Sequence, residues 1–296
     1  MKSGRWLSAS LALIALGCSG LPNDPITPPP LMELDAGDKP IFAVAWSPDG
    51  KWIAVGTDEG EVSLFPAEGT PEEGFLKRKH TLPMTLDRIT DLAFSPDGGA
   101  LLAAGQDGRW RLWDLTDRAF PSQEGRAEKP LLACGFGQDG SPLLARPGVW
   151  AYGKLQGVSA AVEPHQIVIG GETHPPPNGD RFTSGATGKR LVAAGTEGGR
   201  LVVAPVGGSP LTVPCLPHRI SAVALSPDET KVALGGVDAW LQIRDARSGA
   251  LLLKIPFQTG WITDIAWSPD GSRLVVSGHD LTHSPGIHRV RVYGVD

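Results

Sequence analysis

The chain has 296 residues, which allows one large domain or two small ones, and 41% of them are hydrophobic, enough for a buried core. Its 38 glycines and 27 prolines stay below the proportion typical of disordered chains. The net charge is −5 and the longest basic run is KRK at 77–79, so the composition argues against nucleic acid as a main partner.

The N-terminal segment is typical of an export signal. Lys2 and Arg5 precede a mostly apolar stretch, 6–17, that is too short to span a bilayer but suits a signal peptide over 1–17. The residues ALGC at 15–18 resemble the cleavage box of bacterial lipoproteins, with Ala15 where Leu is more usual. The resemblance implies cleavage before Cys18 and lipidation of that cysteine. The alternative is an ordinary secretory signal with an incidental cysteine.

The residues after Cys18 predict the membrane to which the chain is anchored and the tether that joins it to the anchor. In lipoproteins of two-membrane bacteria, a residue other than Asp after the cysteine, here Ser19, goes with transfer to the outer membrane. The resemblance therefore implies an exported lipoprotein at the outer membrane, facing the periplasm or the cell surface. Several acyl chains anchor a protein firmly, at about 0.8 kcal/mol per buried methylene. Residues 18–30 end in three prolines and predict an extended tether.

From residue 31 onward the chain repeats one phrase. AWSPDGKWIAVG at 45–56 returns as AFSPDGGALLAAG, ALSPDETKVALGG and AWSPDGSRLVVSG. Repeat units begin near residues 41, 89, 131, 182, 220 and 262, a spacing typical of the four-stranded blades of a propeller. The clear units cover 41–69, 89–118, 220–249 and 262–296, and the weaker ones 131–155 and 182–208.

Each clear unit predicts three strands, with the repeated turn between the first two. Pro presets φ, Ser and Asp bond to the nearby backbone, and Gly accepts positive φ. We expect a structural role for these turn residues, because a ring of blades disperses the aspartates instead of gathering them for catalysis. The turn residues are Ser47, Pro48, Asp49, Gly50, Ser95, Pro96, Asp97, Gly98, Ser226, Pro227, Asp228, Ser268, Pro269, Asp270 and Gly271.

These units resemble the WD40 repeat family over residues 41–296. The unit at 89–118 ends in Trp113-Asp114, the dipeptide that names the family, and its GQDGRWRLWDL favours WD40 over the propeller repeats of the TolB type, which also use WSPDG. The family links a His, a Ser or Thr, a turn Asp and the Trp by hydrogen bonds within a blade. No unit carries the complete set, since Arg244 stands where Trp would follow His218 and Asp238.

The resemblance implies an all-β fold, a single β-propeller of four-stranded antiparallel blades over 31–296. We favour six blades over seven, and interpret 156–181 as an outer strand plus the start and an inserted loop of the following blade. The last unit lacks an outer strand, and the apolar-alternating stretch 31–36 lacks a partner. We therefore expect 31–36 to pair with the C-terminal strand and close the ring, which removes two exposed sheet edges.

Histidine and cysteine are the candidates for chemistry. His279, His283 and His288 fall within ten residues and could bind zinc or copper, although the spacing matches no known site and a polar hairpin insertion is the simpler interpretation. Cys134 and Cys215 are placed on different parts of the ring, which predicts free, buried thiols rather than a disulfide.

Taken together, the sequence predicts a non-enzymatic, lipid-anchored propeller that acts as a protein-interaction scaffold at the bacterial envelope, with no cofactor. Its partners would be proteins and, through the anchor, the membrane, but not nucleic acid. Two alternatives stay open: a metal-binding or enzymatic propeller that uses the 279–288 loop or the axial channel, and an architectural envelope protein that assembles with itself. We expect recognition in the long loops 66–88, 117–130, 171–181 and 280–288.

Overall fold

The computed structural model describes residues 29–67, 80–82, 87–137, 139–145, 148–155, 158–257, 260–280 and 287–295. The expected signal peptide, Cys18 and residues 18–28 of the tether lie outside these ranges. Within them, no helix is long and apolar enough to cross a membrane.

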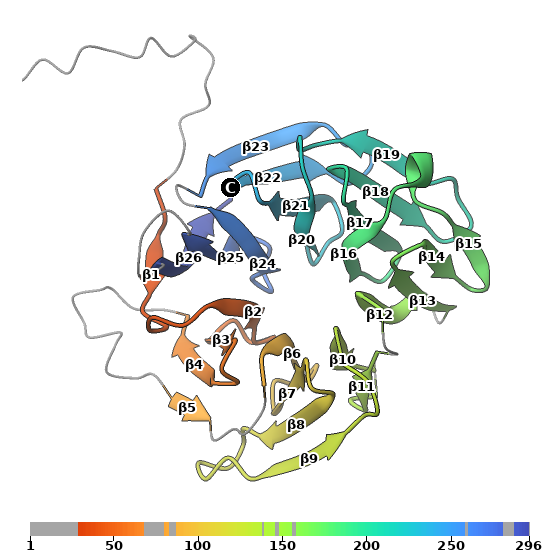
Figure 1. Cartoon of the computed structure of the whole chain (residues 1–296). Helices are drawn as coiled ribbons and strands as arrows, with labels where there is room; N and C mark the ends of the chain where they lie inside the picture. Colours follow the sequence, from red (N-terminus) through yellow and green to blue (C-terminus); the bar gives the residue numbers. More distant parts are fainter. Residues whose placement is uncertain are drawn as a thin grey trace, which may run out of the picture.

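The described residues form six four-stranded antiparallel sheets and one two-stranded sheet, arranged around a common axis (Figure 1). Blade 1 contains β2 (Ile41–Trp46), β3 (Trp52–Thr57), β4 (Val62–Pro66) and β5 (His80–Leu82). Blade 2 contains β6 (Ile89–Phe94), β7 (Ala100–Gly105), β8 (Arg109–Asp114) and β9 (Ser122–Arg126). The two-stranded sheet contains β10 (Cys134–Phe136) and β11 (Pro142–Leu144).

The second half of the ring is more regular. Blade 3 contains β12 (Ala151–Leu155), β13 (Val158–Glu163), β14 (Gln166–Ile169) and β15 (Glu172–His174), after which the short 3-10 helix η3 (Pro177–Gly179) follows. Blade 4 contains β16 (Phe182–Thr187), β17 (Leu191–Thr196), β18 (Arg200–Pro205) and β19 (Leu211–Pro214). Blade 5 contains β20 (Ile220–Leu225), β21 (Lys231–Gly236), β22 (Trp240–Asp245) and β23 (Leu251–Pro256). Blade 6 contains β24 (Trp261–Trp267), β25 (Arg273–Asp280), β26 (Ile287–Gly294) and β1 (Met32–Leu34).

Strand β1 closes the ring, as the sequence predicted. It pairs antiparallel with β26, with Glu33 opposite Arg291. The Glu33 carboxylate pairs with Arg289 and with Nε of Arg291, the latter at 3.0 Å. Met32 and Leu34 point into a buried cluster shared with blade 1, and Leu34 is only 2% exposed. The N-terminal strand therefore joins the two ends of the propeller through both apolar contacts and ion pairs.

The stretch after residue 130 differs from the expected arrangement. Strands β10 and β11 form a separate small sheet between blades 2 and 3, and β12 pairs with β13 instead of with β11. Residues 156–181 are therefore not an outer strand plus an inserted loop, because they supply three of the four strands of blade 3. The repeat is hidden here because the hairpin turns no longer use Ser-Pro-Asp-Gly, and β14 turns into β15 through Gly170 and Gly171 at positive φ.

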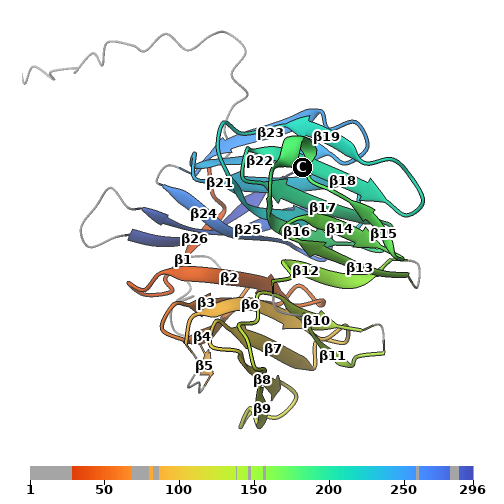
Figure 2. The ribbon, with the colours of Figure 1, turned by 45° about the vertical axis from the view of Figure 1, so that its right-hand side comes forward.

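Three of the long loops that we expected also contain outer strands. The range 66–88 contains β5, 117–130 contains β9, and 171–181 contains β15. Sequence periodicity missed them because these strands are short or mostly exposed, so they carry little apolar alternation. Figure 2 shows the four strands of blade 2 following one another from β6 to β9.

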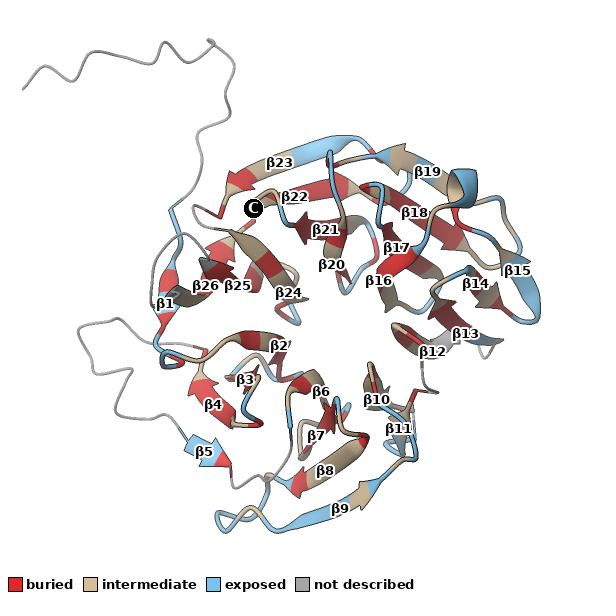
Figure 3. Cartoon of the chain, viewed as in Figure 1, coloured by how far each residue is buried: buried red, intermediate tan, exposed pale blue. Residues whose placement is uncertain are grey.

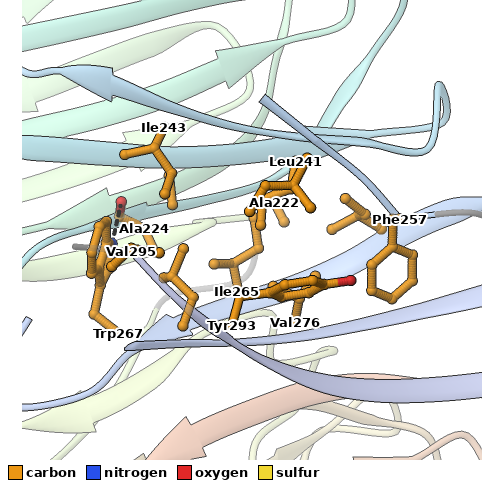
Figure 4. Close-up of a cluster of buried hydrophobic side chains, with 14 residues drawn as sticks. Ala222, Ala224, Leu241, Ile243, Phe257, Ile265, Trp267, Val276, Tyr293 and Val295 are labelled. Atoms are coloured by element: carbon orange, nitrogen blue, oxygen red, sulfur yellow. Dashed lines mark hydrogen bonds between the residues drawn. The ribbon is translucent and has the colours of Figure 1, made fainter. Parts of the chain in front are cut away.

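The core lies between blades and not only within them. Figure 3 shows middle strands such as β17 and β21 largely buried and the outer strands β5, β9 and β15 largely exposed. One cluster joins blades 5 and 6, with Trp267, Phe257 and Tyr293 packed among Ala, Ile, Leu and Val side chains (Figure 4). The indole Nε1 of Trp267 donates to the carbonyl oxygen of Ala224 at 3.2 Å, so this contact also crosses from one blade to the next.

The repeated turns have one hydrogen-bond pattern. In the first turn, Ser47 Oγ donates to Asp49 Oδ1 at 2.6 Å and accepts from the Trp52 amide at 2.9 Å, and Gly50 has a φ of 72°. The turns that begin at Ser95, Ser226 and Ser268 repeat this pattern. In blade 5 the glycine position is Glu229, with a φ of 59°, and its carboxylate accepts hydrogen bonds from the Lys189 and Arg190 amides of blade 4.

Candidate functional site: the axial pocket

A pocket of about 480 Å³ lies on the propeller axis. Most of its wall comes from the beginnings of the innermost strands β2, β6, β12, β16, β20 and β24, with the residues just before them. The repeated Ser-Pro-Asp turns follow the other end of these strands in blades 1, 2, 5 and 6, with Glu229 in place of the glycine in blade 5. We call the end where the innermost strands begin the entry face, and the end with the turns the turn face.

Hydroxyl side chains tie the pocket wall together. Thr90 Oγ1 donates to the carbonyl oxygen of Leu131 at 2.7 Å, Thr183 Oγ1 to that of Ile220 at 2.6 Å, and Thr263 Oγ1 to that of Ile41 at 2.8 Å. Each bond runs from one sheet to the next around the ring. The corresponding residue of blade 1 is Phe42, whose ring instead packs under the Arg88 guanidinium, 4.3 Å from the ring centre.

Two aspartates in the pocket also link neighbouring sheets by hydrogen bonds. Asp91 Oδ2 accepts from the Cys134 amide at 2.7 Å, and Asp264 Oδ2 accepts from the Val44 amide at 2.8 Å, so each carboxyl joins its blade to the next sheet. Burial raises the pKa of Asp91 to about 7 and that of Asp264 to about 8. Both carboxyl groups therefore already accept hydrogen bonds from backbone amides. The sequence signal for this pair was the repeated Ile-Thr-Asp at 89–91 and 262–264, which we did not single out.

The pocket thiol is not activated. Cys134 is half-buried on β10, and its Sγ lies 3.7 Å from the carbonyl oxygen of Leu102. Burial, together with the neighbouring Asp91, raises the pKa of this thiol, whereas a reactive cysteine needs a lowered pKa. Cys215 lies beyond β19, also half-buried, and burial raises its pKa as well. Both cysteines are free, and neither is as fully buried as we expected.

Unpaired N–H donors surround the pocket. The Nε atoms of Arg88 and Arg219 and the indole Nε1 atoms of Trp150 and Trp261 are buried and have no hydrogen-bond partner among the described residues. These four side chains come from four different parts of the ring and all line the pocket. A buried donor without a partner costs free energy, so these four N–H groups are polar atoms of the pocket-lining residues that the described part of the chain leaves unsatisfied.

The histidine candidates lie beside this pocket. His279 and His288 are cross-strand neighbours on β25 and β26, and their Nδ1 atoms are 3.1 Å apart. Burial, and then the proximity of His288 and Arg88, lower the pKa of His279 to about 4. Burial also lowers the pKa of His288. His283 lies outside the described residues, and within them no group of three or more His, Cys, Asp or Glu residues is arranged to hold a metal.

The hydrogen-bond set that WD40 blades often share is incomplete here, as the sequence indicated. In blade 5 His218 and Asp238 lie 3.8 Å apart, but Arg244 occupies the Trp position. Its buried guanidinium donates to Gln242 Oε1 at 2.9 Å and to the carbonyl oxygen of Gly249 at 2.8 Å. In blade 2 Trp113 is fully buried, and its Nε1 has no hydrogen-bond partner in the described part of the chain. In blade 5, Arg244 therefore links the third strand, β22, by a hydrogen bond to the turn that follows it.

Comparison with known proteins identifies WD40 repeats in part of the chain. The sequence profile described as "WD domain, G-beta repeat" matches residues 29–65, 76–114 and 249–282, which include most of the inner strands of blades 1 and 2. A solved structure, the β-propeller domain of Cps50 (Swd1) from Myceliophthora thermophila, aligns with a TM-score of 0.69 at 16% identity and covers 91% of this chain and all of that domain. This likeness shows the propeller fold.

Several curated proteins share shorter regions with the chain. The protein of Cryptococcus neoformans named "Probable cytosolic iron-sulfur protein assembly protein 1" is 33% identical over 32% of this chain and 24% of its own length. The target of rapamycin complex subunit wat1 of Schizosaccharomyces pombe is 30% identical over 39% of this chain and 35% of its own. The telomerase protein component 1 of the rat is 28% identical over 80% of this chain but only 9% of its own length. The matched region is thus a minor part of each relative.

Proposed function

We propose that this chain is a non-enzymatic WD40-type scaffold that binds a protein partner on its entry face. The observation that carries the proposal is the axial pocket, where four N–H donors without a partner in the described ranges lie together with several half-buried aromatic rings. Arg and Trp are the residue types that contribute most to protein interfaces. The names of two relatives, a complex subunit and an assembly protein, describe proteins that work with others, which supports the same class of function.

The pocket favours a partner segment rich in acceptors, and we propose an acidic peptide segment. Arg88 and Arg219 bring two positive charges to the pocket wall, although the chain as a whole carries −5. A carboxylate can accept from a guanidinium and from an indole N–H at once, which matches the unpaired donors. The potential catalytic groups favour binding over catalysis, since Asp91 and Asp264 hold the backbone together and the Cys134 thiol has a raised pKa.

We further propose that the propeller is exported and held at the outer membrane by lipidated Cys18, with 18–30 as its tether. The support is the apolar stretch at 6–17 followed by ALGC and Ser19. Labelling of cells with a fatty-acid analogue should mark the full chain and not the Cys18→Ala variant, and the variant should leave the membrane fraction. Equal labelling of both chains would contradict the anchor without affecting the proposed entry-face interaction.

Affinity purification from crosslinked membranes tests the binding proposal. The full chain is compared with Arg88→Gln/Arg219→Gln and with a control, Arg118→Gln/Arg247→Gln, whose exposed arginines follow the third strands of blades 2 and 5 on the turn face. A partner should be captured by the wild type and the control and lost from the entry-face variant. Because hydrogen bonds to charged groups contribute about 1.5–3 kcal/mol, we expect affinity to fall about tenfold or more. Equal capture by both variants, or capture of the chain itself only, would contradict the proposal.

A further inference from the structure

We propose that His279 and His288 form a binding site for one divalent transition-metal ion, held between their Nδ1 atoms. The inference does not depend on the proposed protein partner. Both residues lie in blade 6, on adjacent strands that are fixed in register from Arg273–Gly294 to Asp280–Ile287. The pair is therefore held by a regular ladder, not by the loop between the strands.

The separation of the two nitrogens carries the argument. Two imidazole nitrogens bound to one Zn²⁺ at about 2.0–2.1 Å in tetrahedral geometry lie about 3.3 Å apart, and two adjacent nitrogens of a square-planar Cu²⁺ site about 2.9 Å apart. The Nδ1 atoms of His279 and His288 are 3.1 Å apart, between these values. Without a metal, the two atoms can share a single proton in one hydrogen bond. With a metal, both can act as ligands after a shift of a few tenths of an ångström.

The surroundings hold the imidazoles in place. His279 is 4% exposed, and its ring meets the rings of Phe42 and Trp261 edge-on, with ring centres 5.0 Å and 6.3 Å away. Its Nε2 is buried without a hydrogen-bond partner among the described residues, so Nδ1 is the nitrogen that the fold pairs. An Nε2–H group can still donate a weak hydrogen bond to the face of an aromatic ring. His288 is only half-buried, which leaves a route for the ion from solvent.

The nearby charges set the expected affinity. Asp58 and Asp38 act on His288 as negative charges and favour a cation, whereas Arg88 acts on His279 and opposes one. Two protein ligands leave the remaining coordination positions to water. We therefore expect moderate binding, in the micromolar range, with Cu²⁺ held more tightly than Zn²⁺ because imidazole sites follow the Irving–Williams order.

Titration with Cu²⁺ tests the site on the full chain, purified in detergent without a histidine tag and treated with a chelator. We expect one Cu²⁺ per chain with an electron paramagnetic resonance spectrum that shows two equatorial nitrogen ligands. His288→Ala should lower the affinity at least tenfold. The control His165→Ala, which removes an exposed histidine of blade 3, should bind as the wild type does.

Three results would overturn the proposal: no binding of Cu²⁺ or Zn²⁺ at 100-fold excess, a spectrum without two equatorial nitrogens, or binding that His288→Ala leaves unchanged. Loss of binding in His283→Ala with retention in His288→Ala would likewise contradict it, since the pair would then not be the site. The wild-type spectrum counts nitrogen ligands directly, so the test stands even if His288→Ala folds poorly.

Discussion

At the scale of single residues, the same few hydrogen bonds recur in every clear blade. The four turn serines are between 0% and 5% exposed, and each both donates to the turn aspartate and accepts a backbone amide. The Ser268 and Ser272 hydroxyls and the backbone amide of Ser272 lower the pKa of Asp270 to about 2. A buried serine hydroxyl that makes two hydrogen bonds is thus a feature common to all four repeated turns.

Removing one of these hydroxyls should destabilise the propeller. Ser268→Ala removes the hydroxyl that accepts from the Arg273 amide and one of the hydrogen bonds to Asp270, so we expect the free energy of unfolding to fall by about 1–2 kcal/mol. Urea denaturation measures the change, with Ser159→Ala, an exposed position on β13, as the control. A Ser268→Ala chain as stable as the control would show that the bond network contributes little.

The two pocket aspartates predict a dependence of stability on pH. Their folded pKa values, about 7 and about 8, are raised above the ordinary value of 3.8, so the folded chain holds these protons more tightly than the unfolded chain. The stabilisation is complete below the ordinary value and is lost as the pH rises through about 7 to 8. For these two groups the melting temperature should therefore fall progressively as the pH rises from about 4 to about 8, and should level off above about pH 8. His279, with a pKa lowered to about 4, changes stability in the acidic range instead.

Asp264→Asn tests this assignment because the amide cannot ionise. The variant should melt lower overall, since one backbone amide loses its acceptor, but its melting temperature should change less between about pH 4 and pH 8 than that of the wild type. Glu172→Gln, an exposed site on β15, should keep the wild-type slope. Identical slopes for the wild type and Asp264→Asn would assign the pH dependence to other groups.

At the scale of strands, the sequence predicted the blades that carry the repeated turn and missed the strands that lack it. The turn phrase and the apolar strands beside it identified blades 1, 2, 5 and 6, and the unpaired stretch 31–36 identified the closing strand. Blade 3 was missed because its turns use other residues, and β9 was missed because its five residues are mostly exposed. The sequence suggested an axial channel, but the donors that line the pocket could not be predicted, because they come from residues far apart in the chain that meet only when the ring closes.

The closing strand makes a direct prediction about stability. Leu34 is 2% exposed and packs in the cluster that joins blades 6 and 1, so Leu34→Ala should lower the free energy of unfolding by about 2–5 kcal/mol. Leu31→Ala is the matched control, since Leu31 is 60% exposed. Deletion of residues 30–37 should lower the melting temperature further, because it also removes the ion pairs of Glu33. A deletion chain that melts with the wild type would show that β1 does not close the ring.

At the scale of the whole molecule, the two faces of the ring have different properties. The turn face carries repeated hydrogen-bonded turns that satisfy their own polar groups. The entry face opens into a pocket whose Arg and Trp donors are unpaired among the described residues, next to the His279–His288 pair. A repeated fold thus supplies rigidity, and the residues that depart from the repeat, such as Phe42 and Trp150, supply the distinctive surface.

Hydrogen–deuterium exchange of the full chain, with and without its crosslink-identified partner, tests the central claim most directly. If the partner binds the entry face, amides at 87–92, 216–222 and 260–264 should exchange more slowly in the complex, and those of the turns at 47–51, 95–99 and 268–272 should not change. Protection confined to the turns, with the entry-face segments unchanged, would contradict the proposed binding surface.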